Sequence, residues 1–121
     1  MTNLYSILDV KTQMYGPIIS FHNDMAAIRA FMEMIISGDR NSMISLYPSD
    51  YILTVVGKFD QDKGLVEGIP RPEHVITGME AMTRAISENE QRRRLRQQLQ
   101  GVEQEQEQVE KDVLENKLHV N

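Results

Sequence analysis

The chain contains no cysteine, and this absence excludes several kinds of protein chemistry. Disulfide frameworks, thiolate nucleophiles and cysteine-based zinc sites all require that residue. A protein without disulfides fits a reducing compartment, so we expect it to act in the cytoplasm. The N-terminus also lacks the basic start and long apolar core of a signal peptide, and no apolar run approaches the length of a membrane span. We therefore expect no contact with membranes.

Positive charge is in short supply as well. The chain has 13 lysines and arginines against 18 aspartates and glutamates, which gives a formal net charge of −5. Proteins that coat nucleic acid through bulk charge neutralise many phosphates, and this balance argues against that mode of binding.

Large apolar side chains are scarce toward the C-terminus, which leaves a globular part of about 80 residues, a size at which one core is only marginally stable. Self-association or a protein partner is therefore expected.

Patterns for catalysis and metal binding are also missing. Asp60, Asp62 and Gly64 are similar to the start of a calcium-binding loop, but the glycine comes one place too early and Arg71 stands where a bidentate glutamate is needed. The three histidines lie in separate segments without ligand spacing. No motif organises a nucleophile, and no glycine-rich loop is present to bind a phosphate. We expect no catalytic residues, no metal site and no cofactor, and a protein that is not an enzyme.

A β-hairpin is the clearest structural signal that the chain does contain. Residues 51–59 are rich in aromatic and β-branched side chains, and residues 60–64 supply turn formers. We expect Gly64 to adopt the positive φ that such a loop needs. One face of the first strand is apolar, whereas the other face carries Ile52 and Val56 beside polar residues. That mixed face is too apolar to be freely solvated, so we expect the tail or a second subunit to cover it.

Shorter elements precede the hairpin. Two strands are expected, at residues 4–10 and 18–21. Residues 25–36 place apolar side chains at the spacing of one buried helical face, with Asn23 or Asp24 as the helix cap. Gly38 is expected to end that helix in the left-handed conformation. The predicted fold class is α+β, with a small antiparallel sheet of about four strands, one packed helix and a long C-terminal helix.

Prolines and glycine in residues 68–72 predict a boundary, because they interrupt a sheet and stiffen a linker. The expected organisation is a core domain at 1–68, a Pro/Gly linker at 69–76 and a charged helical tail at 77–121. Thr77 and Glu80 form a capping box, which starts the tail helix at Gly78. We expect its first segment to pack back on the domain through an apolar stripe formed by Met79, Met82 and Ile86.

A weak heptad repeat follows in the tail. Its apolar seam, which we expect to form an oligomer or partner interface as a coiled coil, consists of Leu95, Leu99, Val102, Val109 and Val113. A parallel homodimer would set Glu105 against Glu110 across the seam. An antiparallel pair would instead bring the basic residues 92–96 toward the acidic run 103–115. We therefore favour antiparallel self-pairing, or an outside partner, over a parallel zipper.

A cluster of arginines has two interpretations. It comprises Arg92, Arg93, Arg94 and Arg96. On a helix, the first two and the last project to one side and could contact phosphates. Alternatively, the cluster is the basic half of a charge-segregated coiled coil. The second interpretation is favoured because acidic residues follow within the same helix and no aromatic side chain stands nearby for base stacking.

An ordered set of short motifs runs through residues 4–66. It comprises Tyr5-Ser6-Ile7, Asp9, Gly16-Pro17, Asn23-Asp24 with residues 27–31, Pro48-Ser49-Asp50-Tyr51, Leu53, Gly57, Phe59-Asp60 and Gly64. This set resembles the small nonstructural protein of microviruses, the tailless single-stranded DNA bacteriophages, and is most similar to the gokushovirus branch. The resemblance implies a non-capsid accessory protein that is assigned to the switch toward single-stranded genome synthesis or to packaging. It supplies no catalytic residues.

Two functions are expected from these observations. The first is a non-enzymatic bacteriophage accessory protein that acts in the host cytoplasm, in genome replication or packaging, through contacts with protein and single-stranded DNA. The alternative is an oligomeric adaptor or scaffold that binds a viral or host protein through its helical tail and does not contact DNA.

Overall fold

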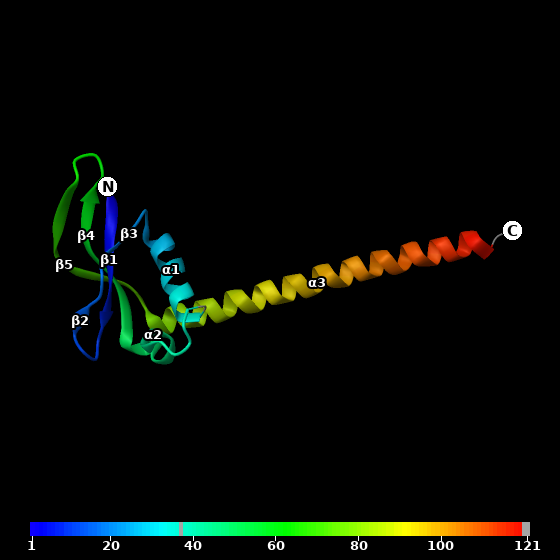
Figure 1. Ribbon diagram of the computed structural model, residues 1–121, viewed down its shortest axis with the longest axis horizontal. Helices are drawn as coiled ribbons and strands as arrows, with labels where there is room; N and C mark the ends of the chain where they lie inside the picture. The colour runs from blue at the N-terminus through cyan, green and yellow to red at the C-terminus, as the bar shows by residue number, and fades with distance from the viewer. Residues whose placement is uncertain (37, 120–121) are drawn as a thin grey trace. The chain divides into compact units, whose positions relative to one another are not determined.

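The computed structural model describes residues 1–36 and 38–119. In chain order, its elements are β1 (Thr2–Asp9), β2 (Met14–Tyr15), β3 (Ile19–Phe21), α1 (Asp24–Ile36), α2 (Met43–Leu46), the 3₁₀-helix η1 (Pro48–Asp50), β4 (Tyr51–Asp60), β5 (Leu65–Thr77) and α3 (Gly78–His119). The predicted α+β class is confirmed (Figure 1). The chain divides into two compact units, Met1–Ile86 and Ser87–Asn121, and these are described separately below.

The sheet of the first unit is antiparallel and has the strand order β2-β1-β4-β5. Strands β2 and β3 share the remaining edge of β1, where they pair with its two ends. Between them the strand assignment is interrupted at residues 16–18, where the Gly16 amide still donates to the Ile7 carbonyl at 2.9 Å but Pro17 has no N–H to donate. The Ser6 hydroxyl partly fills this gap, since it donates to the Gly16 carbonyl at 2.8 Å. A short polar side chain therefore connects β1 to its broken edge.

The β4–β5 hairpin has the predicted turn. Gly64 adopts a φ of 68°, which confirms the expected left-handed conformation. One carboxylate oxygen of Asp60 accepts from the amides of Asp62 and Lys63, at 3.0 and 3.2 Å. The Asp60 carbonyl accepts from the Gly64 amide at 2.8 Å. The aspartate thus serves the turn itself, which is the ordinary role of this residue in a loop.

Strand β5 continues where the sequence predicted a linker. The prediction that Pro70 and Pro72 stop the sheet is wrong, because β5 extends to Thr77. Its pairing with β4 shifts at this point, so that residues 69–72 lie opposite Val56 alone. β5 is the edge strand of the sheet, and prolines in a bulge on an edge remove no hydrogen bond that the ladder needs.

Helix α1 begins as predicted but ends differently. Asn23 is the residue that caps it, since its side-chain oxygen accepts from the Ala26 amide at 2.9 Å. Gly38 does not have a positive φ, so the expected left-handed end is wrong. The Gly38 amide donates to the Glu33 carbonyl at 3.1 Å, and a Cβ on Gly38 would lie 2.7 Å from the Met34 carbonyl oxygen. Glycine is required there for close approach to the last turn.

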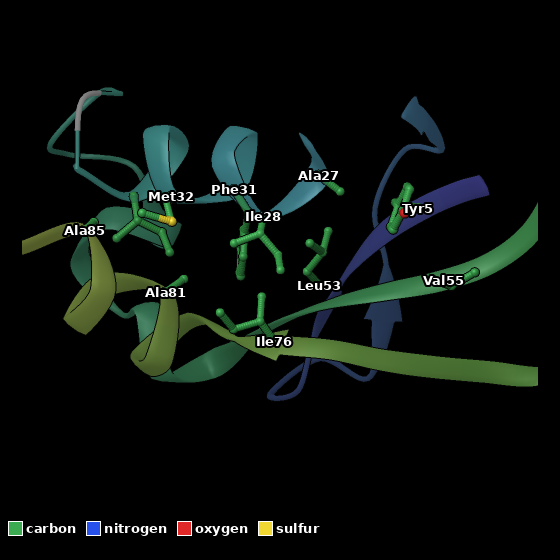
Figure 2. Packing of buried hydrophobic residues seen from close by; sticks show 11 residues of the cluster. Tyr5, Ala27, Ile28, Phe31, Met32, Leu53, Val55, Ile76, Ala81 and Ala85 are labelled. Carbon is green, nitrogen blue, oxygen red and sulfur yellow. The ribbon is translucent and has the colours of Figure 1, made fainter. Parts of the chain in front are cut away.

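The core lies between the sheet, α1 and the first turns of α3 (Figure 2). α1 contributes Ala27, Ile28, Phe31, Met32 and Ile35. The sheet contributes Tyr5, Leu53, Val55 and Ile76, and α3 contributes Ala81 and Ala85. Full burial of each large apolar side chain contributes about 1.5–3 kcal/mol. Helix α3 is therefore part of the folded unit for its first two turns.

The expected α3 stripe is partly wrong. Met82 packs against the core, but Met79 and Ile86 are 50% and 49% exposed. The alanines at 81 and 85, which are almost completely buried, face the core instead. Ala81 and Ala85 belong to the same cluster of buried residues as Met32 of α1 (Figure 2). Here α3 contributes small side chains to the core, and a search for the helical spacing of large apolar residues does not find them.

Gly78 fixes the start of α3. A Cβ at this buried position would lie 1.8 Å from the Pro48 carbonyl oxygen and 3.1 Å from that of Tyr51. The predicted helix start at Gly78 is confirmed, and the Thr77 hydroxyl accepts from the Glu80 amide at 3.2 Å. The turn from β5 into α3 thus depends on one capping hydroxyl and one residue without a side chain.

Candidate interaction surfaces

The α3 segment after Ile86 carries the predicted seam. From Ser87 to Lys117 every residue is exposed except Gly101, which is intermediate. The exposed fractions of the seam side chains are 59% for Leu95, 64% for Leu99, 51% for Val102, 60% for Val109 and 48% for Val113. Leu114, which sequence reasoning did not include, is 61% exposed as well. Apolar side chains with this exposure are available to a partner.

The middle of this seam forms a continuous strip on the helix. Val102, Gln106 and Val109 lie along it, with Glu105 and Glu110 beside them. Leu95, Leu99 and Val113 extend the same strip in both directions by heptad spacing. The structure thus places the predicted seam residues on one side of one helix, with carboxylates beside the middle of the seam.

The arginine cluster is divided between two sides of the helix. Arg92, Arg93 and Arg96 share a strip with Asn89, Gln97 and Gln100, and Arg94 lies outside it. All four arginines are exposed. Because an α-helix turns about 100° per residue, the basic strip lies roughly a third of a turn from the seam. Arg96, which directly follows Leu95, is the strip residue that flanks the seam, so a ligand on the strip and a partner on the seam would both reach it.

Ile52 and Val56 lie on β4, in the first compact unit. Both are only partly buried. Between them, Thr54 is completely buried and its hydroxyl donates to the Ser6 carbonyl at 2.7 Å. The hydroxyl at the centre of this mixed face therefore has its hydrogen-bond partner within the same chain. Whether a second subunit covers Ile52 and Val56 stays a prediction.

A shallow hollow of about 400 Å³ lies beside the β1–β2 turn, and sequence reasoning missed it. Its lining is mainly apolar and includes Ile7, Met14, Tyr15, Met34, Ile44 and Tyr51. Asp9 stands at its edge, where one carboxylate oxygen accepts from the amides of Lys11 and Thr12. Burial, followed by the charges of Asp9 and Asp50, raises the pKa of Tyr51. The hollow could take an apolar side chain, but it presents no group arranged for a reaction.

Tyr5 is the most perturbed titratable residue of the first unit. Its hydroxyl donates to Asp24 at 2.7 Å and accepts from the Asn3 side chain at 3.3 Å. Burial, followed by the hydrogen bond to Asp24, raises the pKa of Tyr5 to about 12. Its ring also meets Phe21 edge-on, with the centroids 5.7 Å apart. This arrangement ties β1 to the N-terminus of α1, which is a structural role.

Several residues of the phage-like motif therefore have structural roles. Ser6 contacts the broken edge at Gly16, Asn23 caps α1, and Asp60 closes the hairpin.

In the described part of the chain, no group of three or more histidine, aspartate or glutamate residues could hold a metal ion. Over the same residues, no helix combines the length and apolar character of a membrane span.

The fold and its surfaces define a small α+β protein with an exposed C-terminal helix. The chain belongs to the family described as Phage ORF5 protein, whose sequence model matches residues 2–81. It is also similar to Protein ORF5 of Chlamydia phage 1, with 40% identity over 62 residues. The match covers 50% of this chain and 65% of that relative. These findings confirm the predicted microvirus-type phage protein.

No solved structure matches the chain. The family match ends at residue 81, in the first turns of α3, so it includes most of the first compact unit. The seam and the arginine cluster lie outside it.

Proposed function

We propose that this phage protein is a non-enzymatic accessory factor that acts in the host cytoplasm at the stage of genome replication or packaging. In this proposal, the α3 segment after residue 86 contacts protein and single-stranded DNA. The observation that carries it is the separation of two surfaces on one exposed helix, a basic strip and an apolar seam. The membership in a phage family supports the setting.

The basic strip suits phosphates because Arg92, Arg93 and Arg96 are exposed and lie together. Guanidinium groups bind phosphate oxygens through paired N–H donors. With a net charge of −5 the protein as a whole repels DNA, so contact depends on this strip. Three phosphate contacts on a single strand would lower the affinity roughly 20-fold between 50 and 200 mM salt.

Fluorescence anisotropy with a labelled single-stranded oligonucleotide tests this proposal. The full chain should bind at low salt, and replacing Arg92, Arg93 and Arg96 with glutamine should remove most of the binding and flatten its salt dependence. The matched control replaces three exposed arginines of the first unit, at positions 29, 40 and 71, with glutamine. Both variants change the net charge equally. An absence of binding by the unmodified chain at low salt, or an equal loss in the control, would refute DNA contact through the strip.

A second function is favoured by the exposed seam. An adaptor that binds a viral or host protein through Leu95, Leu99, Val102, Val109 and Val113 needs no DNA contact. This alternative is tested by isolating the full chain from infected cells and identifying the proteins bound to it. The same isolation is then made with a variant carrying Leu99→Glu and Val109→Glu. A protein that is lost with the variant, together with no oligonucleotide binding at low salt, would favour the adaptor function over the accessory role with DNA contact.

A further inference from the structure

We infer that the α3 segment after residue 86 pairs in antiparallel orientation with the same segment of a second copy of the chain. This inference goes beyond the proposed function, because it names the occupant of the seam and its direction. It does not depend on DNA contact. The reasons lie in the exposure of the seam, its spacing and the distribution of charge along the helix.

The segment lacks the packing that normally stabilises a helix. No residue from Ser87 to Lys117 is buried, although Leu95, Leu99 and Val109 are large and apolar. Most helical stability in proteins comes from tertiary packing of an apolar face, and helix propensity alone is marginal in water. A second helix laid on the seam would supply that packing. The seam is narrow, which is typical of a coiled coil and less so of a helix that covers a globular core.

One antiparallel register brings all the apolar seam positions into facing layers. This register is symmetric: if one residue faces a second residue of the other copy, the second residue also faces the first. Each layer therefore occurs twice, related by a two-fold axis. The layers are Leu95 with Val113, Leu99 with Val109, and Val102 with Gln106 of the second copy. Each leucine then faces a valine, and Gln106 is next to the centre of the pair.

Charges beside the seam support this register. Arg96 lies beside Glu110 of the second copy on one flank, and Gln98 lies beside Asp112 on the other. Each of these contacts also occurs twice. Within one chain, Gln108 already donates to Asp112 at 3.0 Å, so the same pair of side-chain types forms a hydrogen bond on this helix. The flanking contacts are thus complementary toward both ends of the pair.

The ends of the segment decide between the two orientations. Residues 92–96 carry four arginines, and in the antiparallel register they face residues 112–116, where Asp112 flanks the seam and no basic residue is present. In a parallel pair the four arginines would lie beside the same four arginines, and Glu105 would lie beside Glu110. The acidic middle, residues 103–107, meets acidic residues in both arrangements. Repulsion there weakens the pair without favouring either direction.

Replacement of one carboxylate separates the two orientations by sign. Glu110→Arg places a cation beside Arg96 of the second copy in the antiparallel pair, and self-association should weaken about tenfold. In a parallel pair the same change removes repulsion with Glu105 and would tighten association. The control Glu115→Arg makes the same charge change on the side of the helix away from the seam, and should have little effect. Sedimentation equilibrium of the full chain measures each dimer constant.

A charge swap gives the corresponding rescue. The double variant Arg96→Glu and Glu110→Arg exchanges the two partners and should restore the original dimer constant in the antiparallel pair. Tighter association of the Glu110→Arg variant, or failure of the swap to restore it, would overturn the antiparallel assignment. A purely monomeric mass for the unmodified chain at high concentration would overturn self-pairing itself.

Cysteine cross-linking reads the orientation directly, because the natural chain contains no cysteine. Chains carrying Leu95→Cys are mixed with chains carrying Val113→Cys and oxidised mildly. The antiparallel register predicts a disulfide between the two different chains, whereas a parallel pair gives disulfides only between identical chains. If neither kind of disulfide formed, the pairing of two chains would be overturned. Oligonucleotide binding by the same proteins reports separately on DNA contact, so the two proposals can fail independently.

Discussion

Helix α1 and the exposed part of α3 are both regular helices, but they differ in the packing of their apolar side chains. α1 places five buried residues in 13, and these are packed against the sheet and the first turns of α3. The segment after Ile86 has a thin seam and no buried residue up to Lys117. The density of the apolar face thus distinguishes a helix that completes a core from one that is available to a partner. Substitutions in the two regions should therefore have very different effects on folding.

The largest effect is expected at the junction of β5 and α3. Gly78→Ala would force a Cβ to within 1.8 Å of the Pro48 carbonyl oxygen, so the backbone must move. We expect a loss of about 4 kcal/mol or more in the free energy of unfolding, measured by urea denaturation. The control is Gly68→Ala on β5, where no atom lies within 4 Å of the added Cβ. Equal stability of the two variants would contradict the close approach.

Core truncation should separate the two regions almost as strongly. Phe31 is 1% exposed, and Phe31→Ala should cost about 3–5 kcal/mol of stability. Leu99→Ala removes a side chain that is 64% exposed, and should change core unfolding by no more than about 0.5 kcal/mol. Near-UV circular dichroism during denaturation follows the core alone, since all tyrosines and phenylalanines precede residue 60. Similar losses for both variants would mean that the tail is part of the same cooperative unit.

Much of the fold could be predicted because the local signals agree with each other. Gly64, the Asn23 cap and the Thr77 cap each combine one residue type with one backbone requirement, and the structure has all three. The linker at 69–76 was wrong because two prolines are compatible with a bulged edge strand, and the sequence does not reveal which strand forms the edge.

Tertiary proximity explains what the sequence did not predict. Ala81 and Ala85 follow no pattern of large apolar residues, and only their burial in the core cluster identifies them as core positions. Gly78 was expected as a helix start, but its need to be glycine comes from Pro48, which is distant in sequence. Of the candidate surfaces, the seam and the basic strip could be located because both lie on one regular helix. The hollow beside Asp9 is formed by residues from β1, β2, α1, α2 and β4, so no local pattern indicates it.

An intermediate effect is expected from the buried tyrosine. Tyr5→Phe removes the hydroxyl that donates to Asp24 at 2.7 Å and leaves the ring in place. The variant should lose about 1–2 kcal/mol of stability at pH 7. Tyr51→Phe is the matched control on a partly buried tyrosine of the same unit. If Tyr5→Phe were as stable as the unmodified protein, the link between β1 and α1 would not contribute.

The same residue predicts a dependence on alkaline pH. The pKa of Tyr5 is about 12 in the folded protein against 10.0 for a free tyrosine, so the unfolded chain loses this proton first. The stabilising contribution of the neutral hydroxyl is therefore complete below pH 10 and is lost as the pH rises toward 12. Urea denaturation at pH 9 and pH 11 should show a smaller difference between the unmodified protein and Tyr5→Phe at the higher pH. A constant difference would contradict the raised pKa.

The smallest effect is expected within the tail. Gly101→Ala adds a side chain where no atom lies within 4 Å, and should stabilise the helix by about 1 kcal/mol. On heating, far-UV circular dichroism should show that the variant keeps more helix than the unmodified protein, while the near-UV transition of the core stays unchanged. A shift of the core transition would indicate that the two regions unfold together.

Hydrogen exchange of the full chain, measured residue by residue at a low and a high protein concentration, tests the difference between the two regions most directly. At both concentrations, the amides of β1, β4, α1 and the first two turns of α3 should exchange slowly. The amides of residues 87–117 should exchange rapidly in dilute solution and gain protection only at high concentration. Slow exchange of that segment in dilute solution, or fast exchange at every concentration, would contradict a folded core with a separate helix that pairs with a second copy.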